Sequence, residues 1–220
     1  MLMRSKSGLI LDLLRLRYDP NQIVVKLALR DALRSCKDVL DVGCGHSSSL
    51  RLFGVPRCVG IDGYLPSVEE ARRKGTHDEV FHGSVTELGK AFEPKSFDAC
   101  IAIDVIEHLT KADGLQLIND MERLARKRVI FFTPNGFLPQ RHISNDDLQE
   151  HLSGWEPEEM ARRGFEVRGL LGPKTLRGEH HSLRKKPAVF WGLVSFAGQP
   201  LVWRKPRRAA AILCVKKLAP

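Results

Sequence analysis

The chain has 220 residues, of which 43% are hydrophobic and 28% charged. This composition is enough to bury the core of one α/β domain with an insertion. No apolar run reaches the roughly eighteen residues of a simple membrane span, and no secretory signal is convincing because Asp12 interrupts the apolar stretch 8–14.

The net charge of +9 is concentrated near the C-terminal end of the sequence. Residues 172–220 contain eleven Lys or Arg and one acid, Glu179. A local basic region indicates an acidic partner such as phosphate, nucleic acid or anionic lipid, or else a solvated basic surface.

The cysteines argue against a metal knuckle and against a disulfide framework. They are odd in number and form no CxxC pair. We expect most of them to be small buried residues in strands, in a cytoplasmic protein. They are Cys36, Cys44, Cys58, Cys100 and Cys214.

The first predicted unit, residues 1–37, is a helical cap packed over the domain. Apolar residues recur at helical spacing on both sides of Asp19-Pro20. They are Leu9, Ile10, Leu13, Leu14 and Leu16 before it, and Ile23, Val24, Leu27 and Leu33 after it.

Strand and helix patterns then alternate through a predicted α/β core, residues 38–169. Strands are expected at 39–42, 58–61, 79–82, 97–103, 129–133 and 165–169, and helices at 46–53, 66–74, 111–126 and 146–163. Strands that are apolar throughout and separated by helices predict a parallel sheet buried on both faces.

The C-terminal part divides into two predicted pieces. Residues 170–208 read as an irregular, basic and apolar insertion, and residues 209–220 as a last strand with a short tail. The whole pattern fits an open α/β sheet of seven strands.

The junction after the first strand carries the strongest motif. Asp41 is followed by Gly43-Cys44-Gly45, and the second strand ends in Asp62-Gly63. Glycines let a ligand approach the backbone closely, and an acid at the end of the second strand can accept ribose hydroxyl groups. A dinucleotide fingerprint is not completed, because Ser48 stands where the third glycine belongs.

This junction resembles the first motif of class I S-adenosylmethionine-dependent methyltransferases, and the later strands agree. The third strand runs into Ser84-Val85, where the family often has Asp in place of Ser84, and the fourth ends in Asp104. The resemblance implies a seven-stranded Rossmann-like sheet, parallel with a final antiparallel strand and helices on both faces. It implies S-adenosyl-L-methionine as cofactor, bound by Asp41, Gly43, Cys44, Gly45, Asp62, Gly63, Ser84, Val85 and Asp104.

Three side chains after the fourth strand are the predicted catalytic residues: Asp104, Glu107 and His108. Their spacing resembles the carboxylate-x-x-Glu-His element of ubiquinone-pathway O-methyltransferases, which can hold a divalent cation. We expect no metal here and consider His108 as a general base for a hydroxyl acceptor. The alternative is that Glu107 and His108 only orient the next helix.

The acceptor is predicted to be a hydroxyl on a small, glycan or lipid-linked molecule. Thr133-Pro134-Asn135-Gly136 is not the loop that amine-methylating relatives carry, which in any case follows their fourth strand. With the later His142 and Gly164-Phe165-Glu166-Val167, it loosely resembles bacterial methyltransferases found with glycan genes. His151 and Trp155 are expected either to face the acceptor or to be structural.

Residues 184–208 suggest a peripheral membrane contact. An uncharged stretch, 187–203, contains Trp191 and Trp203 and lies between basic clusters. The alternative is a helical hairpin that closes the site or forms a dimer contact.

Two further functions stay open: a nucleic-acid methyltransferase, less favoured, that uses the basic region, and a non-catalytic cofactor-binding partner protein.

Overall fold

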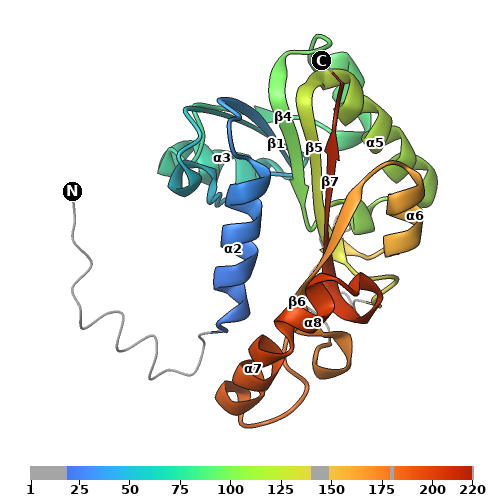
Figure 1. Cartoon of the computed structure of the whole chain (residues 1–220). Helices are drawn as coiled ribbons and strands as arrows, with labels where there is room; N and C mark the ends of the chain where they lie inside the picture. The colour runs from blue at the N-terminus through green and yellow to red at the C-terminus, as the bar shows by residue number, and fades with distance from the viewer. Residues whose placement is uncertain (1–18, 140–148, 179–180, 220) are drawn as a thin grey trace.

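The computed structural model describes residues 19–139, 149–178 and 181–219. The apolar positions expected at 9–16 and His142 lie outside these ranges. Figure 1 shows the chain as one twisted sheet with helices packed against it.

All seven predicted strands are present in one sheet. Its order is β3 (Glu79–His82), β2 (Arg57–Asp62), β1 (Asp38–Val42), β4 (Phe97–Ile103), β5 (Ala125–Pro134), β7 (Ala209–Lys217) and β6 (Glu166–Pro173). Strands β1 to β5 are parallel, and β7 runs antiparallel to both β5 and β6. The predicted seven-stranded Rossmann-like sheet with a final antiparallel strand is therefore confirmed.

Helices cover both faces of the sheet, as expected. Helix α5 (Lys111–Leu124) buries Leu117 and Met121 in a cluster with Leu40 of β1 and Phe131 of β5. On the opposite face, α2 (Asn21–Ala32) packs beside Ile130 of β5. Alternate residues of β5 thus enter different clusters, which is why this strand is apolar throughout its second half.

Helix α2 lies within the predicted cap, and its buried face agrees only in part with the expected one: Leu33 is buried and Val24 is half-buried, but Ile23 and Leu27 are not. It buries Val25, Ala28 and Leu29 against the sheet, whereas Ile23 and Leu27 are exposed by 45% and 58%. Small residues on the buried stripe bring the helix close to the strands.

Two expected helices are shorter than predicted. After β1 only a 3-10 turn forms, Leu50–Phe53. The Ser48 hydroxyl bonds Asp41 and the N–H of Leu50 instead, a competition with helical hydrogen bonding that serine often wins. The helix expected at 146–163 is described only as α6 (Pro157–Arg162), because the N–H groups of Leu152 and Ser153 bond the Glu107 carbonyl.

The remaining helices are α3 (Leu65–Lys74) and α4 (Leu88–Ala91), together with two in the predicted insertion. The insertion is not irregular: β6 extends to Pro173, and α7 (Ala188–Ala197) and α8 (Gln199–Trp203) follow. Figure 1 shows α7 at the lower end of the molecule. Among the described residues, no helix is both long enough and apolar enough to cross a bilayer.

All five cysteines are buried and free, as expected from their spacing. Cys58, Cys100 and Cys214 lie in strands, whereas Cys36 and Cys44 lie in loops.

Candidate functional site

Three adjoining cavities meet at Asp104, where the strand order reverses between β1 and β4. Ligands of open α/β sheets bind at this switch point. We call them the glycine-loop cavity, the histidine cavity and the α2 cavity, after the residues that line each.

The glycine-loop cavity has a volume of about 630 Å³ and contains most of the predicted cofactor residues. It is lined by Gly43, Gly45, Asp62, Gly63, Ser84, Val85 and Asp104, among others. The structure therefore brings seven of the nine predicted cofactor residues to one cavity, although they come from four separate loops.

The backbone conformation and the neighbouring side chain at position 43 allow only glycine. The φ of Gly43 is +66°, and an added Cβ would lie 2.4 Å from a methyl carbon of Val105. The Gly45 N–H donates to Asp62 Oδ2 at 2.8 Å, and the N–H of Tyr64 donates to Asp62 Oδ1 at the same distance. Asp62 thus fixes the glycine loop and also borders the cavity.

Two predicted cofactor residues lie elsewhere. Cys44 packs against Gly60, where an added Cβ would come within 2.7 Å of its sulfur, and it borders the α2 cavity. Asp41 is buried and also borders the α2 cavity. Asp41 Oδ2 accepts a hydrogen bond from the Ser48 hydroxyl at 2.9 Å and lies 3.1 Å from His77 Nε2. Sequence reasoning missed His77, because a single buried histidine has no motif.

The chemistry of the glycine-loop cavity fits S-adenosylmethionine. Its lining combines glycines, which leave the backbone accessible, with the side chains of Asp62 and Ser84. A nucleoside with a charged amino-acid tail needs such a combination of close backbone approach and oxygen acceptors.

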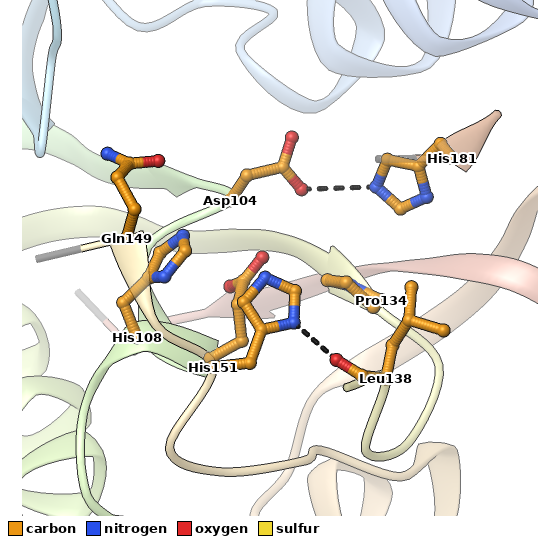
Figure 2. A pocket seen from close by; sticks show the side chains of 8 residues that line it. Asp104, His108, Pro134, Leu138, Gln149, His151 and His181 are labelled. Carbon is orange, nitrogen blue, oxygen red and sulfur yellow. Dashed lines mark hydrogen bonds and ion pairs between the residues drawn. The ribbon is translucent and has the colours of Figure 1, made fainter. Parts of the chain in front are cut away.

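Asp104 borders all three cavities and has the backbone conformation of a constrained residue. Its φ is +51°, which is uncommon outside glycine. Its N–H donates to the Phe132 carbonyl at 2.8 Å, which ties the end of β4 to β5. Figure 2 shows its side chain directed toward His181.

Glu107 is buried in the floor of the histidine cavity. It is 2% exposed and accepts a hydrogen bond from the Thr133 hydroxyl at 3.0 Å. Burial, reinforced by the nearby Asp104 carboxylate, raises the pKa of Glu107 to about 8. The side chain is therefore poised to keep a proton near neutral pH.

His108 and His151 lie beside each other in the same cavity (Figure 2), with ring centres 4.8 Å apart. His108 Nδ1 is 3.1 Å from the Glu150 carbonyl, and His151 Nδ1 is 2.6 Å from the Leu138 carbonyl. A carbonyl can only accept, so each Nδ1 carries the proton and Nε2 is the basic atom of the neutral ring.

Glu107, His108 and His151 can also present ligands to a cation. Their ligand atoms all lie within 4.8 Å of one another. One carboxylate and two imidazoles suit a divalent metal, with the backbone carbonyls at Nδ1 acting as outer partners. Asp104, the first predicted catalytic residue, lies at the edge of this group rather than within it.

Trp155 is structural, one of the two expected outcomes. It is fully buried, its indole N–H lies 3.2 Å from the Ile106 carbonyl, and Lys111 Nζ lies 3.5 Å from its ring centre. His151, by contrast, faces the cavity.

His181 is the functional candidate that sequence reasoning missed. It comes from the insertion, yet its Nε2 lies 3.4 Å from Asp104 Oδ1. Its carbonyl accepts a hydrogen bond from buried Arg177 at 2.7 Å, and Arg177 also pairs with Asp19 at 2.6 Å. In the sequence, the one signal of function in this segment was its basic composition.

The α2 cavity, of about 360 Å³, adjoins both others. Val25 and Leu29 of α2, with Phe132 and Leu171, supply apolar walls, and Lys26 lies at its border. This cavity offers space for an apolar part of an acceptor beside Asp104.

Comparison with known proteins gives a consistent result. A family model described as a methyltransferase domain matches residues 40–133. Probable tRNA methyltransferase 9B of Homo sapiens is 34% identical over 87 residues, which make up 39% of this chain and 18% of that protein. The match thus spans less than a fifth of the relative.

Solved structures share the fold over most of the chain. An S-adenosylmethionine-dependent methyltransferase from Archaeoglobus fulgidus superposes with a TM-score of 0.59 at 16% identity, covering 97% of this chain and all of that one. A putative methyltransferase in complex with the Trm112 activator of Haloferax volcanii gives 0.54 at 17% identity, covering 87% and 88%.

Proposed function

Because this chain is a class I S-adenosylmethionine-dependent methyltransferase, we propose that it methylates a hydroxyl oxygen of a small, glycan or lipid-linked acceptor. The observation that carries the proposal is that the histidine cavity adjoins the glycine-loop cavity, and that Asp104 and His108 border both. An acceptor in the histidine cavity meets basic nitrogens and carboxylates at the border with the cofactor.

The cofactor residues act by binding and alignment. Gly43 and Gly45 would leave room for the cofactor tail, Asp62 would accept hydrogen bonds from the ribose hydroxyl groups, and Ser84 and Val85 would contact the base. Asp41 and Cys44 support the loop from behind. Holding two reactants in line removes much of the entropic barrier to transfer.

When bound, S-adenosylmethionine supplies a methyl group and its own leaving group: the acceptor oxygen bonds the methyl carbon as the carbon–sulfur bond breaks, and the sulfur keeps the electron pair. The acceptor proton passes to His108 Nε2, whose opposite nitrogen is held by the Glu150 carbonyl. Asp104, at the border of the same cavity, stabilises the resulting imidazolium, and protonated Glu107 orients the hydroxyl.

A second way to activate the hydroxyl is favoured by the cluster Glu107, His108 and His151. These three residues would hold a divalent cation, which would lower the pKa of a bound hydroxyl group without a protein base. Activity that is lost with a chelator and restored by a divalent metal selects this form; activity that persists selects His108 as base.

Methylation of tRNA is the competing function. It is favoured by the curated relatives named probable tRNA methyltransferase 9B and by the basic residues 184–208. The absence from the sequence of an amine-methylation loop after β4 favours a hydroxyl acceptor, which nucleic acid also contains.

A lipid-linked acceptor requires contact with a membrane surface. Residues 184–208 are the part of the chain suited to a peripheral contact of this kind, since basic side chains flank an apolar stretch. The protein then works at the cytoplasmic face of a membrane.

The test uses methyl-labelled S-adenosylmethionine and an extract of the cells that make the protein. Products are partitioned between organic and aqueous phases, with a Gly43→Arg variant as the control. Label in the organic phase supports a lipid-linked acceptor. Label in the aqueous phase that resists nuclease supports a small or glycan acceptor. Label released by nuclease overturns the proposal in favour of nucleic acid.

A further inference from the structure

Helix α7 is attached to the body of the protein by its smallest side chains. Its two buried residues are Gly192 and Ser195. A Cβ at Gly192 would lie 3.7 Å from Pro20, and the Ser195 hydroxyl donates to the Leu171 carbonyl at 3.2 Å. Such residues allow a close approach, but they bury little apolar surface.

Most of the large apolar side chains of α7, together with Leu201 of α8, are exposed. Phe190 and Leu193 are each 55% exposed, and the others are 38–50% exposed. The exposed set is Val189, Phe190, Leu193, Val194 and Phe196 of α7 with Leu201 of α8. At about 100° per residue the five in α7 span roughly 160° of the helix surface. A continuous apolar surface of this kind marks an interaction site.

Basic residues flank this apolar face in the chain, and we call them its basic rim. Lys185 and Lys186 precede α7, Arg204 and Lys205 follow α8, and all four are exposed. Lys185 Nζ lies 4.4 Å from the ring centre of Trp191, which places a cation beside an aromatic side chain at the edge of the face. The sequence has no acid from residue 182 to residue 217.

We propose that α7 and α8 form a docking face for an anionic lipid bilayer. The exposed apolar side chains enter the interface between headgroups and acyl chains, and the basic rim contacts lipid phosphates. Charge selects this partner: a second copy of the chain would bring an equally basic rim against the first.

The face lies at the end of the sheet that carries the site. Ala211, near the start of β7, pairs with Pro134 at the end of β5, and α8 ends only a few residues before β7 begins. Figure 1 shows α7 projecting beyond this end of the sheet. A docked α7 therefore brings the cavities close to the bilayer surface.

Buried Arg177 links the face to the site. Its Nη2 donates to the Ser195 hydroxyl of α7 at 3.2 Å, and its Nη1 holds the carbonyl of His181. Docking thus stabilises the segment that places His181 beside Asp104. The delivery of a lipid-linked acceptor rests on the proposed function, whereas the docking itself does not.

The test is flotation of the full chain with vesicles of phosphatidylcholine alone, or with about one third phosphatidylglycerol, at two salt concentrations. We expect flotation with the anionic vesicles and at least about tenfold less with the neutral ones or at high salt. The assay contains no S-adenosylmethionine, so its failure leaves methyl transfer untouched, and failure of methyl transfer leaves docking untouched.

Two variants separate the apolar face from its rim. Leu193→Glu and the pair Lys186→Glu with Lys205→Glu should each abolish flotation. The matched controls are Leu52→Glu, at an exposed leucine outside α7 and α8, and the pair Arg34→Glu with Lys90→Glu, which changes the net charge equally. Circular dichroism and the affinity for S-adenosylmethionine verify that each variant is folded.

Several results would overturn the proposal. They are no flotation of the wild-type chain, equal binding to neutral vesicles, or flotation of the α7 and rim variants at the wild-type level. Two others would as well: a dimer that Leu193→Glu converts to monomer without any vesicle binding, and retention of RNA, but not of vesicles, that the rim variants abolish.

Discussion

His181 Nε2 lies 3.4 Å from Asp104 Oδ1, although the two residues are 77 positions apart in the chain. Asp104 belongs to the end of β4, and His181 to the segment between β6 and α7. The pair closes one side of the space in which the three cavities meet. A residue of the insertion thus contributes to the proposed acceptor site.

Replacing His181 tests this contribution. We expect His181→Ala to lower the turnover number by about 10- to 100-fold, because Asp104 loses its partner at the acceptor. The dissociation constant for S-adenosylmethionine, measured by calorimetry, should change by less than about twofold, since His181 does not border the glycine-loop cavity. His181→Asn, which can still donate to Asp104, should recover part of the activity.

The opposite pattern would contradict this role. Weaker binding of S-adenosylmethionine with unchanged turnover would place His181 at the cofactor, and equal losses in His181→Ala and His181→Asn would indicate a purely structural effect.

Gly43→Ala should weaken S-adenosylmethionine binding by at least about tenfold, because its Cβ would meet Val105 and distort the glycine loop. Gly54→Ala is the matched control, since Gly54 also has a positive φ, of +78°, but has no atom within 4 Å of the added Cβ. Both should lose about 1 kcal/mol of stability from backbone strain. Calorimetry measures the loss of cofactor affinity, and thermal unfolding measures the loss of stability. Equal affinities of the two variants for S-adenosylmethionine would show that Gly43 does not shape the cofactor site.

Glu107→Gln should stabilise the protein at neutral and alkaline pH. The pKa of Glu107 is raised to about 8 in the folded chain, above the ordinary value of 4.5. The unfolded chain ionises first as pH rises, so the free energy of unfolding of the wild type falls between about pH 4.5 and pH 8. Glutamine does not ionise, so the free energy of unfolding of the variant does not fall in this way.

The stability difference between Glu107→Gln and wild type should therefore grow over this range and then level off, reaching on the order of 5 kcal/mol. Urea unfolding at a series of pH values, with a chelator present, measures it. Glu69→Gln, at an exposed glutamate, is the control and should show no such trend. A difference that shrinks with rising pH would mean that the ionised carboxylate is the form stabilised by folding.

Arg177→Met should destabilise the chain by about 3 kcal/mol, because it leaves the partly buried Asp19 without its cation and frees the carbonyl of His181. Adding Asp19→Asn should restore part of the loss, since the uncompensated charge is then removed. Thermal unfolding of the two single variants and the double variant measures the coupling. Strictly additive losses would show that the pair contributes no interaction energy.

The sequence was sufficient where a local pattern has a physical cause. Predominantly apolar segments, 97–103 and 209–217, predicted β4 and β7 with the observed bounds. A helix with strong periodicity, 111–126, differs from α5 by two residues. The glycines and acids at strand ends predicted a cofactor cavity, because parallel strands deliver their carboxyl ends to one edge of the sheet.

Local patterns failed where contacts between distant residues decide the conformation. The helix expected at 46–53 is reduced to a turn because Ser48 bonds Asp41, and the one expected at 146–163 is shortened because the Glu107 carbonyl takes two N–H groups. The insertion appeared irregular because α7 carries its large apolar side chains outside, which hides the usual amphipathic pattern.

The sequence by itself determined the fold class and the cofactor, because both depend on motifs of neighbouring residues. Only the tertiary structure decided that Asp41 and Cys44 line the α2 cavity rather than the glycine-loop cavity. It also decided that His151 lies beside Glu107 and His108, and that His181 lies beside Asp104. His151 and His181 are far from these partners in the chain. The N–H groups of Leu152 and Ser153, which bond the Glu107 carbonyl, hold the segment of His151, and the packing of the insertion against α2 and the sheet positions His181.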